Sequence, residues 1–90
     1  MSPSLVMELD DFVRARSHDI AVAADFGMFL EPDRARGLCE PKVSWRVVAT
    51  AFLFWESALP VEYGIRTSAD CLRVVKEYFR QNHKLHHHKH

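Results

Sequence analysis

Five histidines gather in the last eight residues of this 90-residue chain, and their imidazole nitrogens could bind a metal ion. The candidate ligands are His86, His87, His88 and His90. Imidazole suits zinc, nickel or copper(II), but a terminal run of histidines has no surrounding shell of side chains to fix the coordination geometry. The sequence therefore predicts a loose metal-binding tail and no bound cofactor.

Two origins fit this histidine-rich end. Lys84-Leu85, just before the main run, resembles a cloning junction, which indicates a purification tag. The interruptions by Lys84, Leu85 and Lys89 are instead typical of a natural tail. In both cases we expect residues 83–90 to form a flexible tail, outside a single helical domain that spans residues 1–82.

The two cysteines could form one disulfide bridge, but nothing in the sequence requires it, and free thiols are the default prediction. Cys39 and Cys71 are 32 residues apart and lack the C-x₂-C spacing of zinc knuckles and thioredoxin-like pairs. A lone cysteine on a helix usually packs as a small apolar side chain, and we expect this of Cys71. Free thiols are the rule in reducing compartments, so the sequence favours a cytoplasmic location.

The chain has no pattern that is typical of a catalytic centre. His18 is the one histidine outside the tail, and although Asp19 follows it, no nucleophile is placed to use this pair. The HExxH, GxSxG, P-loop and GxGxxG patterns do not occur. We therefore predict that the protein is not an enzyme.

Charge and apolar runs argue against two classes of partner. Twelve acidic groups balance twelve basic ones, and two of the basic groups are Lys84 and Lys89 in the tail. Nucleic-acid binding needs clustered Lys and Arg, so no nucleic-acid partner is predicted. The longest apolar run, residues 47–55, is well short of the roughly 20 residues that span a bilayer, so no membrane partner is predicted.

Apart from the tail and one connection, the chain is predicted to form helices. Leu5, Leu9, Phe12 and Val13 recur at helical spacing, which predicts a helix over residues 4–16 that Ser2 or Ser4 can cap. Residues 17–30 fit two alternatives: the first helix continues, or Ser17 begins a second one. Gly27 is expected to mark an end or a bend, and residues 32–42 to form the main connection.

The most apolar element follows Ser44, and it predicts a central helix over about 44–59. Its apolar residues cover nearly the whole circumference, which is typical of a helix that is buried on several sides. A buried strand is the alternative, but the length of the run favours a helix. Trp45, Phe54 and Trp55 are the residues we expect near an exposed apolar patch, because aromatic side chains anchor interfaces.

An amphipathic last helix is predicted over about 68–82, with Thr67 or Ser68 as its cap. The sequence thus predicts an all-α fold, a small three- or four-helix bundle. Its expected function is that of a non-enzymatic interaction or regulatory module, paired with a second copy or with another protein. The alternative is a small metal- or ligand-binding helical protein.

Overall fold

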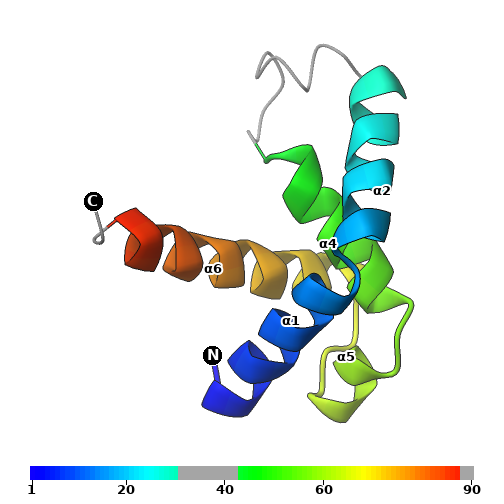
Figure 1. The fold of residues 1–90 in the computed structure, drawn as a ribbon. Coiled ribbons are helices and arrows are strands. Elements are labelled where there is room, and N and C mark those ends of the chain that lie inside the picture. Colours follow the sequence, from blue (N-terminus) through cyan, green and yellow to red (C-terminus); the bar gives the residue numbers. More distant parts are fainter. Residues whose placement is uncertain (31–42, 88–90) are drawn as a thin grey trace.

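The computed structural model describes residues 1–30 and 43–87, and their side chains as far as residue 82. This part of the chain contains helices and no strand, so the predicted all-α fold is confirmed (Figure 1). The helices are α1 (Pro3–Ala15), α2 (Ser17–Leu30), α4 (Trp45–Trp55), α5 (Leu59–Glu62) and α6 (Ser68–His87). The predicted connection over residues 32–42 lies outside the described residues.

The first helix begins where its capping residue predicts. The Leu5 amide donates a hydrogen bond of 3.2 Å to the Ser2 hydroxyl, and Pro3 occupies the first turn, where its missing N–H costs nothing. Leu5, Leu9 and Phe12 form the buried face. The periodicity that predicted this helix therefore also identified its core residues.

A single residue, Arg16, separates α1 from α2. Its backbone (φ −111°, ψ 19°) leaves the helical region, so residues 4–30 form two helices rather than one. The Arg16 carbonyl nevertheless accepts a 2.9 Å hydrogen bond from the Ile20 amide, and α2 starts without an intervening loop. The chain changes direction at this point, and α2 leads away from α1 (Figure 1).

Gly27 lies within α2, so the expectation that it marks an end or a bend is wrong. It is buried together with Ile20 and Ala24 on the side of α2 that packs on α4. A Cβ atom at Gly27 would lie 2.7 Å from Cδ2 and 2.8 Å from Cζ3 of Trp45. Glycine is placed here because the indole ring occupies the space of a side chain.

The central helix α4 begins as predicted but ends at Trp55, four residues before the predicted end. The Ser44 hydroxyl accepts a 3.3 Å hydrogen bond from the Val47 amide at its start. After its end, the Ser57 hydroxyl donates to the Phe54 carbonyl (2.7 Å) and accepts from the Leu59 amide (3.3 Å). These bonds turn the chain into α5, where Pro60 occupies the first turn because it lacks an N–H.

Two groups of buried side chains hold the helices together. The larger joins α1, α4 and α6, and its residues Leu9, Phe54, Cys71 and Val75 have no exposed surface. The rings of Phe12 and Phe54 meet edge to face there, with centroids 5.3 Å apart. The smaller group joins α2 to α4 through Ile20, Ala24 and Ala49. Because α4 belongs to both groups, it is the central helix, as predicted.

The last helix, α6, begins after Thr67, whose hydroxyl accepts a 3.1 Å hydrogen bond from the Asp70 amide. The helix continues to His87, five residues beyond the predicted end. Cys71, Val75 and Tyr78 form its buried face. At 1.5 Å per residue it is about 30 Å long, and it projects beyond the other helices (Figure 1). None of the described helices is both long and apolar enough to cross a bilayer.

Candidate functional site

The predicted metal ligands fall at the end of the chain. His86 and His87 belong to the last turn of α6, and their side chains are outside the described part; His88 and His90 lie wholly outside it. The described residues contain no group of three or more His, Cys, Asp or Glu side chains that could hold a metal ion. The metal-binding tail therefore stays a prediction.

The three aromatic residues predicted at an interface have different environments. Phe54 is fully buried between α1 and α6, so it is a core residue and not part of the surface of the single chain. Trp45 is half-buried against Gly27, and Trp55 is 37 % exposed at the end of α4. One of the three, Trp55, thus lies where an interface residue is expected.

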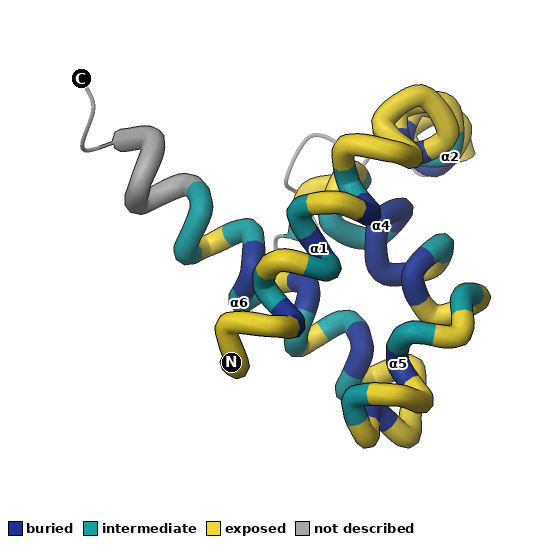
Figure 2. Tube along the Cα trace, turned by 60° about the horizontal axis from the view of Figure 1, so that its bottom comes forward, coloured by how far each residue is buried: buried dark blue, intermediate teal, exposed yellow. Residues whose placement is uncertain are grey.

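Other large apolar side chains, which the sequence did not single out as interface residues, are more exposed than Trp55. Apart from Met1, Met7 and Val61, they belong to α2, whose outer side is mostly exposed (Figure 2), and to the adjoining side of α4. We call this surface the apolar face; it consists of the half-buried Val48 and the exposed residues Val22, Phe26, Phe29, Leu30, Phe52 and Trp55. Phe29 is 80 % exposed and Phe26 62 % exposed, which is unusual for residues of this size.

Helical geometry shows how the α2 part of this face adjoins the α4 part. The two helices run in opposite directions (Figure 1), and Trp45, Ala49 and Leu53 of α4 pack on α2. The row Val48–Phe52–Trp55 adjoins that packed row. With right-handed helices in this antiparallel arrangement, it faces the same side as Phe26 and Leu30 of α2. The apolar face thus extends from Val22 and Phe29, on the side of α2 opposite α4, through Phe26 and Leu30 to the exposed row of α4.

A signal for this surface is present in the sequence of α2. Ile20, Ala24 and Gly27 form one row at helical spacing, and Val22, Phe26 and Phe29 repeat the same spacing on another side. A helix with two apolar rows needs two partners. Within the described residues, α4 covers the first row.

A hollow of about 650 Å³ lies on another part of the surface, where α1, α4 and α6 meet. Tyr78 is buried in its wall and donates a hydrogen bond to the Asp10 carboxylate. Burial, and then this bond to a negatively charged partner, raise the pKa of Tyr78 to about 12. The phenol is therefore neutral at physiological pH, and Asp10 is held in place as an acceptor.

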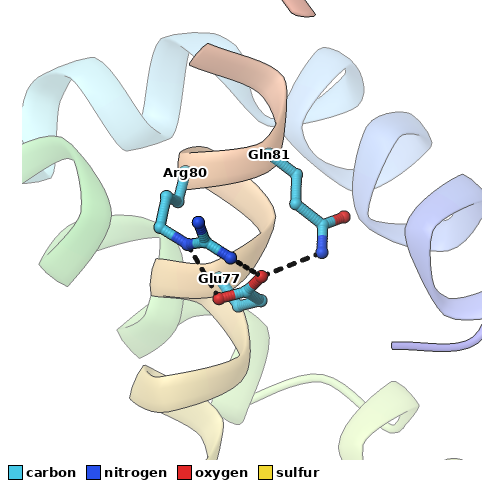
Figure 3. A network of polar contacts seen from close by, with 3 residues as sticks. All are labelled: Glu77, Arg80 and Gln81. Carbon is cyan, nitrogen blue, oxygen red and sulfur yellow. Dashed lines mark hydrogen bonds and ion pairs between the residues drawn. The ribbon is translucent and has the colours of Figure 1, made fainter. Parts of the chain in front are cut away.

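The outer side of α6 carries a small polar network (Figure 3). Arg80 donates to both carboxylate oxygens of Glu77, with an Nε–Oε1 distance of 3.0 Å, and Gln81 Nε2 donates to Oε2 at 2.9 Å. These donors lower the pKa of Glu77 to about 2, so the carboxylate stays ionised at neutral pH. All three residues lie within two turns of one helix, and exposed pairs of this kind stabilise a protein little.

The buried thiol of Cys71 leads to a prediction about its reactivity. Its Sγ lies 3.6 Å from the Ala51 carbonyl oxygen, and burial raises the pKa of the thiol to about 11. At pH 8 about one thiol in a thousand is ionised, and the thiolate is the reactive form. In a Cys39→Ser chain, we expect Cys71 to react with an aromatic disulfide reagent only when denaturant unfolds the protein. Rapid reaction in native buffer would contradict the burial of this side chain.

Comparison of the chain with protein-family models, with curated proteins and with solved structures found no significant match.

Proposed function

We propose that this protein is a non-enzymatic interaction module that pairs with a second copy of itself through the apolar face. The observation that carries the proposal is the exposure of six large apolar side chains on the outer side of α2 and the adjoining side of α4, next to the half-buried Val48. Apolar surface of this kind is unfavourable in water, and it usually marks an interaction site.

The size of the face supports a dimer. From their exposed fractions, Phe26, Phe29, Phe52 and Trp55 leave on the order of 500 Å² of aromatic surface in water. A standard interface buries about 800 Å² on each partner, and about two-thirds of its core area is apolar. The four aromatic residues of one face thus supply more than half of the area that each partner buries in a standard interface.

The chemistry of the face supports a second copy over a charged partner. None of its seven side chains carries a charge, so the face has no group that would select a partner of opposite charge. A second copy offers the same apolar surface, and two-fold pairing covers both faces at once.

The test is the mass of the full chain in solution, measured by light scattering on a sizing column over a range of concentrations. We expect a mass twice the 10.4 kDa of the single chain. Phe26→Glu places a charge within the face and should yield the monomer mass. Met7→Glu is the matched control, because Met7 is 66 % exposed against 62 % for Phe26 but lies on α1, outside the face.

The outcomes separate the parts of the proposal. A monomer at all concentrations of the unchanged chain refutes self-pairing. A dimer that survives Phe26→Glu refutes the assignment to the apolar face. Far-ultraviolet circular dichroism of both variants checks that they retain the helical fold, as expected for substitutions at exposed positions.

A further inference from the structure

The hollow between α1, α4 and α6 is lined by two arginines that come from different helices. Arg14 belongs to α1 and Arg46 to α4, and they are 32 positions apart in the sequence. The volume of about 650 Å³ lies within the range of about 300–1,000 Å³ that is typical of small-molecule sites. It is separate from the apolar face, which contains neither arginine.

The positive charge in this hollow is not neutralised within the described part of the chain. The ion pairs among the described residues join Arg73 to Asp70 and Arg80 to Glu77, all on α6. Neither Arg14 nor Arg46 takes part in these ion pairs. The acidic group among the lining residues is Asp10, which already accepts the Tyr78 hydroxyl. Two guanidiniums against one carboxylate leave a net charge of +1.

The other lining groups suit a ligand with a polar head and an apolar body. The Phe79 ring lies beneath the Arg46 guanidinium, with 5.7 Å between Cζ and the ring centroid, and Val13 adds aliphatic surface. The Ser17 hydroxyl adds a hydrogen-bond donor.

We propose that this hollow binds a small organic anion. Its carboxylate or phosphate group lies between the Arg14 and Arg46 guanidiniums, and its apolar body packs on Phe79 and Val13. Guanidinium is the side chain best suited to planar recognition of such oxyanions. The proposal does not depend on dimer formation, because the apolar face uses a different side of α4.

The test is a titration of the ¹⁵N-labelled full chain, followed by nuclear magnetic resonance, with three probes. Benzoate and phenyl phosphate carry the two anionic heads, and neutral benzamide keeps the ring and the shape of benzoate without its charge. We expect both anions to shift the amides around Arg14, Arg46 and Phe79, and benzamide to bind at least about tenfold more weakly. The anion with the lower dissociation constant identifies the preferred head group.

Variants test the role of each guanidinium. Arg46→Gln and Arg14→Gln should each raise the dissociation constant of the preferred anion about tenfold, the loss expected for one charge-assisted contact. Arg66→Gln is the control, because this exposed arginine lies outside the hollow and should leave the constant unchanged. The proposal would be overturned if benzamide bound as tightly as benzoate, or if no probe shifted any amide. It would also be overturned if Arg66→Gln raised the dissociation constant as much as Arg46→Gln or Arg14→Gln.

Discussion

Replacing Phe54 with alanine is expected to lower the free energy of unfolding by about 3–5 kcal/mol. The Phe54 side chain is fully buried, and its ring packs edge to face on Phe12. Alanine removes these contacts and leaves a cavity between α1, α4 and α6 that a small core cannot fill by relaxation. Domains of this size have a total stability of about 5–15 kcal/mol, so the variant loses a large part of it.

Chemical denaturation followed by circular dichroism measures this loss, and Phe52→Ala is the control. Phe52 lies two residues earlier on the same helix and is 59 % exposed. If Phe52 lies in the proposed dimer interface, Phe52→Ala lowers the free energy of unfolding mainly at concentrations where the chain forms dimers. The loss should therefore become smaller on dilution. The cost of Phe54→Ala should not depend on concentration. Similar costs for both variants in dilute solution would contradict the assignment of Phe54 to the core.

Gly27→Ala is expected to lower the free energy of unfolding by about 1–3 kcal/mol, although alanine is the better helix former. Helix propensity alone would stabilise this variant by about 1 kcal/mol. The added methyl group, however, would lie within 3 Å of three atoms of the Trp45 ring, and the rigid indole cannot yield without losing its contact with α2. Packing therefore outweighs propensity at this position.

The same substitution in a Trp45→Ala chain separates the two effects. With the indole removed, Gly27→Ala should become neutral or stabilising, since only helix propensity remains. Thermal unfolding of the four chains measures the difference between the two backgrounds. A stabilising Gly27→Ala in the chain that retains Trp45 would show that the ring does not occupy this space.

Local signals made the helix starts predictable. Ser2, Ser44 and Thr67 each accept a hydrogen bond from a backbone amide in the first turn of the helix that follows, and such caps depend on neighbouring residues alone. The ends were harder to predict. The Ser57 side chain ends α4 early through two bonds of its own, and a serine near a helix end does not reveal this from its type.

Burial on α4 could not be predicted, because its apolar residues cover nearly the whole circumference. Phe52 and Phe54 have the same side chain and are two positions apart, yet one is 59 % exposed and the other fully buried. The packing of α1 and α6 decides this difference, and helical periodicity contains no information about it. The proximity of Arg14 and Arg46 could not be predicted either, because only the tertiary fold brings these two arginines to one hollow.

The hydrogen bond between Tyr78 and Asp10 joins the first and last helices across 68 positions of the sequence. Closing so long a loop costs more chain entropy than bringing together neighbours such as α2 and α4. We therefore expect α1 and α6 to dock after the folding transition state, in the final step of folding. Contacts absent from the transition state govern the unfolding rate. Substitutions in the α1–α6 contact should thus change the lifetime of the folded protein more than the speed at which it forms.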